Sequence, residues 1–114
     1  MNITGIWIYK EDFEFGKSEG EVEIMQSEND VLAIFTFTEK VENNYEIDVV
    51  EKTTGTISDG KVLLESTEVN AVQVGKKIDY LPNNFDMHLV SENKIVGSTY
   101  DSEDVCGVFV LERK

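Results

Sequence analysis

The chain has 114 residues, of which 40% are hydrophobic and 10% aromatic, and its formal net charge is −13. We expect one folded domain over residues 1–114, with no apolar run long enough for a membrane-spanning helix. A single Cys and a single His argue against a disulfide scaffold and a Cys/His zinc site, and the acidic balance argues against nucleic-acid binding.

The first residues carry no targeting signal that the sequence reveals. Residues 1–7 contain neither a basic segment nor the apolar core of a secretory signal. A lone thiol, here Cys106, is ordinary in a reducing compartment. The expected location is therefore cytoplasmic.

Apolar and polar residues alternate along most of the chain, which is the pattern of half-buried β-strands. No window of helical length carries an apolar stripe with a 3.6-residue period. The region 66–81 is ambiguous, so eight to ten strands fit the pattern. The expected strands cover residues 3–10, 21–27, 30–38, 45–57, 61–69, 72–80, 86–91, 94–100 and 107–113.

Short polar clusters separate these strands. Asp59-Gly60 suits a two-residue type I′ hairpin turn, in which both central residues have positive φ. Residues 27–30 and 91–94 predict two more tight turns. Strands joined by hairpins at even spacing predict an all-β, antiparallel up-and-down barrel, because closure removes the exposed edges of a sheet.

The alternation also predicts which face points inward. In the first strand, odd-numbered residues are mostly Gly or aromatic from Gly5 to Phe15, whereas even-numbered residues are charged from Lys10 to Glu14. Glu11 is the exception on the odd face. The odd face is therefore expected to line the interior.

Two features at the ends of the chain belong together. Gly5-Ile6-Trp7 forms a G-x-W at the start of the first strand, and Arg113 ends the last strand on the same inferred face as Phe109. This pattern resembles the lipocalin or calycin family. The resemblance implies a barrel floor in which Gly5 allows close backbone approach, Trp7 plugs the closed end and Arg113 packs over the indole ring, a cation–π contact.

The chain departs from the family pattern in several ways. It is shorter than a typical lipocalin and shows no C-terminal helix pattern. Where the family carries a T-D-Y-like motif, the sequence has only the pair Asp79-Tyr80. We therefore expect a small lipocalin-like barrel rather than a particular member of the family.

The resemblance implies a non-enzymatic binding protein that holds a small apolar ligand in its lumen and needs no cofactor. The alternative is that side chains fill the interior, as they can in an eight-stranded barrel. The candidate ligand-binding residues on the inferred inner face are Tyr9, Phe13, Phe15, Phe37, Ile47, Met87 and Leu89.

Neither catalysis nor metal binding has a convincing motif. His88 and Cys106 could in principle form a base and nucleophile, but His88 has the parity of an outward residue and no third residue stands out to orient it. The acidic turn at residues 101–104 offers oxygen ligands but does not follow the EF-hand pattern. We therefore expect no enzyme and no metal site.

The net charge supports a second function. Glu21 and Glu23 lie two residues apart on one strand face, as do Glu46 and Asp48. Such rows could meet a basic surface on another protein, with electrostatic steering of the encounter. The alternative hypothesis is thus an acidic protein-interaction module, such as an inhibitor or immunity-type protein, with a filled barrel.

Overall fold

The computed structural model describes residues 2–104 and 106–114. Within these residues the secondary structure is entirely β, and no helix is long and apolar enough to cross a bilayer. Nine strands are present: β1 (Gly5–Phe13), β2 (Gly16–Ser27), β3 (Asp30–Val41), β4 (Ile47–Ser58), β5 (Lys61–Gln73), β6 (Lys76–Ile78), β7 (Asn84–Ser91), β8 (Lys94–Tyr100) and β9 (Cys106–Arg113).

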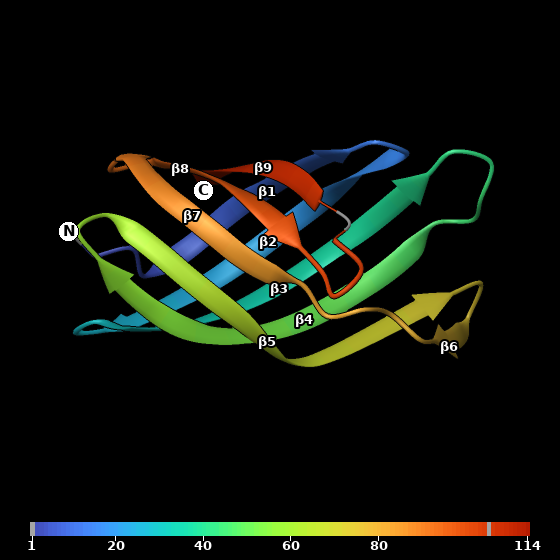
Figure 1. The fold of residues 1–114 in the computed structure, drawn as a ribbon, viewed down its shortest axis with the longest axis horizontal. Helices are drawn as coiled ribbons and strands as arrows, with labels where there is room; N and C mark the ends of the chain where they lie inside the picture. Colours follow the sequence, from blue (N-terminus) through green and yellow to red (C-terminus); the bar gives the residue numbers. More distant parts are fainter. Residues whose placement is uncertain (1, 105) are drawn as a thin grey trace.

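Eight of the strands close into a barrel (Figure 1). Their order is β4-β3-β2-β1-β9-β8-β7-β5, and pairing between β4 and β5 completes the ring. Every pairing is antiparallel. The predicted all-β, up-and-down barrel is therefore confirmed, with β6 as an additional short strand on the far half of β5.

Strand β5 changes its partner part-way along its length. Its residues 61–65 pair with β7, whereas residues 71–73 pair with β6. Between these two segments Thr67 is an extra residue, because Lys52 of β4 pairs with Glu68 while Thr53 pairs with Ser66. A bulge of this kind bends its strand, and it lies where β5 separates from β7.

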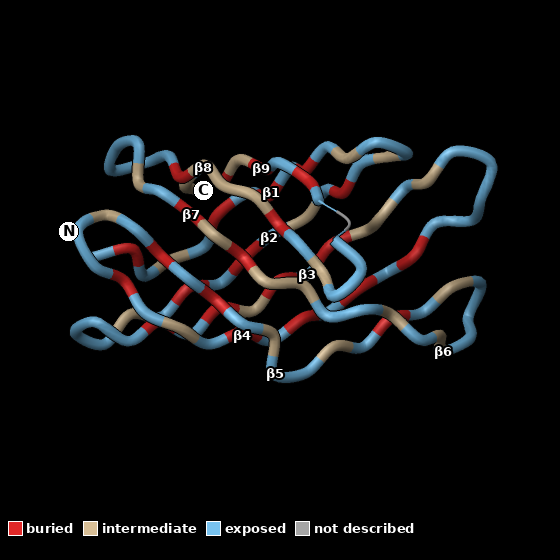
Figure 2. The backbone as a smooth tube through the Cα atoms, in the orientation of Figure 1, coloured by how far each residue is buried: buried red, intermediate tan, exposed pale blue. Residues whose placement is uncertain are grey.

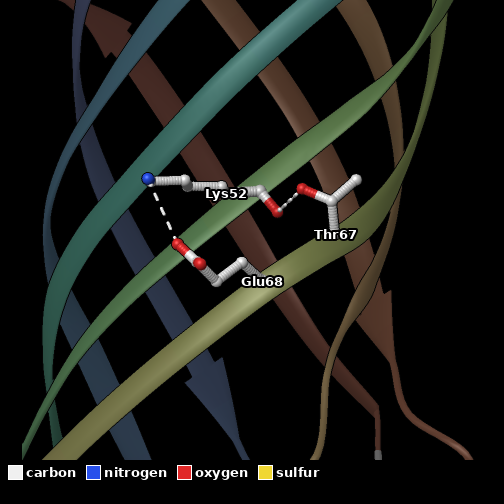
Figure 3. A network of polar contacts seen from close by, with 3 residues as sticks. All are labelled: Lys52, Thr67 and Glu68. Carbon is white, nitrogen blue, oxygen red and sulfur yellow. Dashed lines mark hydrogen bonds and ion pairs between the residues drawn. The ribbon is translucent and has the colours of Figure 1, made fainter.

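Figure 3 shows the polar contacts at this bulge. The Thr67 hydroxyl donates a hydrogen bond to the carbonyl oxygen of Lys52 at 3.1 Å, and Lys52 Nζ lies 3.1 Å from Glu68 Oε2. Both charged side chains are more than half exposed, so the ion pair contributes at most about 1 kcal/mol.

The bulge also explains an error in the predicted strands. The expected division into residues 61–69 and 72–80 is wrong, because β5 runs without a break to Gln73 and the turn falls at Val74-Gly75. Inward residues of β5 are even-numbered up to Ser66 and odd-numbered from Val69. This change of phase blurs the period-2 pattern. By contrast, Asp59-Gly60 has φ values of 51° and 77°, as a type I′ turn requires.

Buried residues recur at every second position along the strands (Figure 2). The hydrophobic ones form one cluster inside the ring. At its centre the rings of Phe35 and Phe85 stack with their centroids 4.1 Å apart, and the edge of Tyr9 meets Phe35 at 5.5 Å. Aromatic side chains therefore fill the middle of the barrel.

The wall of the barrel has unequal height. Strands β3, β4 and β5 have 12, 12 and 13 residues, whereas β7, β8 and β9 have 8, 7 and 8. The long strands project beyond the short ones at the end that carries β6, and both chain termini lie toward the other end (Figure 1). We call the end with β6 the mouth.

Candidate functional site

The end opposite the mouth is plugged by Trp7 and Arg113. The two residues are paired across β1 and β9, and the guanidinium carbon lies 4.4 Å from the centroid of the indole ring. The guanidinium also donates hydrogen bonds to the carbonyl oxygens of Thr4 at 3.1 Å and Glu92 at 3.0 Å. The indole N–H donates to the carbonyl oxygen of Ile3 at 3.0 Å. These contacts close this end of the barrel.

Gly5 is needed beside this plug. Its φ of +147° is a conformation that other residues rarely adopt. A Cβ atom at this position would come within 3.1 Å of Arg113 Nη1. The structure thus places Gly5, Trp7 and Arg113, the three residues singled out in the sequence, in one contact group.

A cavity of about 230 Å³ opens at the mouth. Aromatic and aliphatic side chains share its wall with carboxylates. The rings of Tyr9 and Phe37, which contact each other, lie one inward position farther from the mouth than Glu11 and Glu39 on the same strands. Its lining residues come from β1, β3, β8, β9 and the loops beside them: Glu11, Phe13, Glu39, Tyr80, Leu81, Asn83, Thr99, Asp101 and Cys106.

Glu11 projects into the barrel and is almost fully buried. Its carboxylate accepts hydrogen bonds from the hydroxyls of Tyr9 and Thr99, the latter at 2.5 Å. Gly107 leaves the space for it, because a Cβ there would lie 2.1 Å from Glu11 Oε2. Burial raises the pKa of Glu11 above its ordinary value, and the negative charges of Glu39 and Glu51 raise it further.

Two more carboxylates face the interior near the mouth. Glu39 Oε1 accepts a hydrogen bond from the Tyr80 hydroxyl at 2.6 Å. Glu51, which is fully buried, accepts hydrogen bonds from the backbone N–H and the side-chain amide of Asn83 at 2.8 and 3.1 Å. Burial raises the pKa of both carboxyl groups. These bonds hold segment 79–83 against the inner faces of β3 and β4.

No basic side chain neutralises these carboxylates within the described chain. Every lysine is exposed, and no ion pair involves Glu11, Glu39 or Glu51 among residues 2–104 and 106–114. Arg113 lies at the plugged end. A buried carboxylate without a cationic partner is costly in its charged form, which is the reason that burial raises the pKa of all three groups.

The structure distributes the predicted ligand-binding residues unevenly. Phe13 lines the cavity, Tyr9 and Phe37 lie below it, and Ile47 pairs with Glu39 on the neighbouring strand. Met87 and Leu89 lie farther down β7, on the way to the plugged end: Met87 is fully buried in the core, and the amide of Leu89 bonds to Gly60.

The inward orientation expected for Phe15 is wrong. Strand β1 ends at Phe13 and a turn follows, so Phe15 lies in the loop before β2 and is 65% exposed. Alternation predicts a side-chain direction only while the strand continues. The sequence contained no Gly-Asn or Asn-Gly turn here to mark its end.

Several residues of the cavity were not singled out from the sequence. The two inward acids Glu39 and Glu51 do have a signal in the sequence, because they continue the alternation of inward residues. Glu39 comes two residues after Phe37, and Glu51 comes two residues after Val49. Tyr80 and Asn83 have none, since they belong to an irregular segment whose position depends on distant strands.

His88 and Cys106 are not brought together. His88 is exposed on the outer face of β7 and lies 3.8 Å from Asp86. Cys106 lies at the rim of the cavity, in register with Tyr100. Within the described residues no group of three His, Cys, Asp or Glu side chains is placed to hold a metal ion.

The acidic rows predicted on the exterior are exposed. Glu21 and Glu23 lie on the outer face of β2, and Glu21 forms an ion pair with Lys114. Asp48 accepts a hydrogen bond from Thr38 at 2.8 Å.

Comparison with solved structures finds similar barrels. One is described as a de novo designed fluorescence-activating β-barrel, with a TM-score of 0.72 and 11% identity over 99% of this chain and 94% of that one. Two others are redesigned barrels, mFAP1 and mFAP0, each bound to DFHBI. Their TM-scores are 0.70 and 0.69, both at 14% identity over 97% of this chain and 94% and 98% of theirs. No protein-family model and no curated protein sequence matches the chain.

Proposed function

We propose that the chain is a non-enzymatic barrel of lipocalin-like type that binds a small molecule at its mouth. The observation that carries this proposal is the cavity lined by Phe13, Tyr80 and Leu81 above a packed aromatic layer. The barrel cannot pass a ligand through to the other end, where Trp7 and Arg113 close it. A molecule entering at the mouth therefore stays in the cavity, above the layer that contains Tyr9 and Phe37.

The size of the cavity limits the ligand. Its volume of about 230 Å³ exceeds that of an engineered cavity of about 150 Å³ that holds benzene. It falls short of the range of about 300–1,000 Å³ that is typical for drug-sized ligands. A molecule of one ring with a short side chain fits, whereas a long-chain fatty acid does not.

The similar designed barrels support this proposal. Two of them are bound to DFHBI, so a barrel of this shape and size can hold a small molecule. In the present chain the packed rings of Phe35 and Phe85 occupy the middle of the barrel, and the ligand site is correspondingly assigned to the mouth.

Cys106 offers a test because its thiol lies at the rim of the cavity and is exposed. The reaction of the thiol with neutral 4,4′-dithiodipyridine can be followed in the presence of 2-phenylethanol, 2-phenylethylamine or phenylacetate. We expect at least one of these one-ring probes to slow the reaction saturably. The matched control is Ser58→Cys in a Cys106→Ser background, which moves the thiol to an exposed position at the plugged end.

The proposal is supported if protection occurs at Cys106 and not at the control thiol. Equal protection at both positions indicates nonspecific binding and contradicts the proposal. Lack of saturable protection by all three probes contradicts it as well.

A further inference from the structure

Three inward residues lie side by side across the first three strands at the mouth. Ser18 of β2 is in register with Glu11 of β1 on one side and with Glu39 of β3 on the other. Neighbouring strands are separated by about 4.8 Å. The hydroxyl of Ser18 therefore lies between the two strands that carry the carboxylates, on the same inner face.

We propose that the ligand of this cavity is a small organic cation, a protonated amine carried by a single aromatic ring, whose ammonium group is bound by Glu11 and Glu39. This inference rests on the proposed function and specifies the chemical class of its ligand. It is carried by Glu11 and Glu39, which line the cavity, and by Ser18, which lies between them on the inner face of β2.

The first argument is charge. Glu11 and Glu39 line the cavity and Glu51 lies next to it, and no lysine or arginine of the described chain reaches this end of the interior. Buried carboxylates are normally paired with a cation. A ligand cation supplies the missing partner, while an anionic ligand would add a further like charge.

The second and independent argument is Ser18. Its side chain is 1% exposed, and among the described residues its hydroxyl oxygen has no hydrogen-bond partner. Buried hydroxyls normally have a partner, so this oxygen is available to a ligand. An ammonium group has three N–H donors and no acceptor, and Glu11, Glu39 and Ser18 offer it three acceptors from three adjacent strands.

The wall of the cavity favours an organic cation. The rings of Phe13 and Tyr80 line the cavity, and aromatic faces attract ammonium groups. The hydrogen bonds from Tyr9 and Thr99 hold the Glu11 carboxylate in place, and each carboxylate oxygen can still accept another donor. No three carboxylate, His or Cys side chains of the described chain are grouped for a metal ion.

Calorimetric titration at pH 7.5 with three probes of similar size tests the charge. 2-Phenylethylamine is cationic, 2-phenylethanol is its neutral counterpart and phenylacetate is anionic. We expect the amine to bind at least tenfold more tightly than the alcohol, and phenylacetate to bind most weakly. Glu11→Gln and Glu39→Gln should each weaken amine binding at least tenfold and change alcohol binding less than threefold.

The matched control is Glu23→Gln, an exposed glutamate on the outer face of β2, which should leave all three affinities unchanged. Ser18→Ala tests the third acceptor and should weaken amine binding several-fold. If the alcohol binds as tightly as the amine, or if Glu11→Gln and Glu39→Gln leave amine binding unchanged, the cationic assignment is wrong while the proposed small-molecule site stands. If no probe binds, both are wrong.

Discussion

Arg113 lies directly opposite Trp7 on neighbouring antiparallel strands and covers its indole ring. This pairing joins the first and last strands of the barrel at the plugged end. Trp7 is fully buried, and its ring separates the aromatic core from solvent. The stability of the fold should therefore depend strongly on it.

Trp7→Ala should lower the free energy of unfolding by about 3–5 kcal/mol, because it removes a large buried aromatic side chain and leaves a cavity. Urea denaturation monitored by circular dichroism measures the loss. The control is Val108→Ala, at a position 65% exposed on β9, which should change stability by less than about 0.5 kcal/mol. A loss below about 1 kcal/mol for Trp7→Ala would show that the indole is not a plug.

The acidic interior predicts that stability falls as pH rises. The pKa values of Glu11, Glu39 and Glu51 are raised above 4.5, chiefly by burial. Between pH 4.5 and these raised values the folded protein binds more protons than the unfolded chain, so the free energy of unfolding decreases with increasing pH. Glu11 faces the hydroxyl of Tyr9, and burial raises the pKa of that hydroxyl as well. No cation of the described chain faces Glu11.

Urea denaturation at intervals from pH 4.5 to pH 8 measures this dependence. In Glu11→Gln the decline with pH should be smaller than in the unsubstituted protein, because one titrating group is gone while the hydroxyls of Tyr9 and Thr99 can still bond to an amide. The exposed Glu23→Gln should retain the full decline. A Glu11→Gln curve parallel to the unsubstituted one would contradict the assignment of Glu11 as a buried titrating group.

Gly107 and Glu11 should be energetically coupled. A Cβ on Gly107 would lie 2.1 Å from Glu11 Oε2, so Gly107→Ala must displace the carboxylate and disturb its bond from Thr99. We expect a loss of about 1–3 kcal/mol. In a Glu11→Ala background the same substitution should cost less, with a coupling free energy of at least about 0.5 kcal/mol. Additive losses in the double-mutant cycle would show that the two residues do not compete for space.

Val74 occupies an unfavourable backbone conformation. Its φ is 51° in the two-residue turn before Lys76, and a β-branched residue with positive φ is rare. The side chain is 67% exposed, so little burial would be lost. Val74→Asn should raise the free energy of unfolding by about 1 kcal/mol, as judged by thermal denaturation. Val72→Asn, two residues earlier in β5, should not stabilise, since Asn is disfavoured in strands.

The sequence was most informative where a strand is regular. Alternation correctly predicted the buried faces of the strands that contain Trp7, Ile47 and Phe109, and the Asp59-Gly60 turn was recognised from its residue types. The start of β2 was missed because its inward residues at this end are Ser18 and Gly20, which give no apolar period.

The mouth was predicted less well than the core. Hydrophobic patterning assigns acids to solvent, so Glu39 and Glu51 were not recognised as inward residues, although their parity matches that of Phe37 and Val49. The hydrogen bond from Tyr80 to Glu39 spans 41 residues of sequence. Contacts of this kind follow from the closure of the barrel and cannot be read from local spacing.

The neighbouring positions of the two chain ends have a practical consequence. The backbone N–H of Lys114 donates to the carbonyl oxygen of Ile6, and Arg113 donates to that of Asn2. A short peptide linker could therefore connect the ends without disturbing the ladder between β1 and β9. The polypeptide could then be opened at the exposed loop before β2 to give a circular permutant whose free ends lie beside the cavity at the mouth, a convenient place to attach a reporter group.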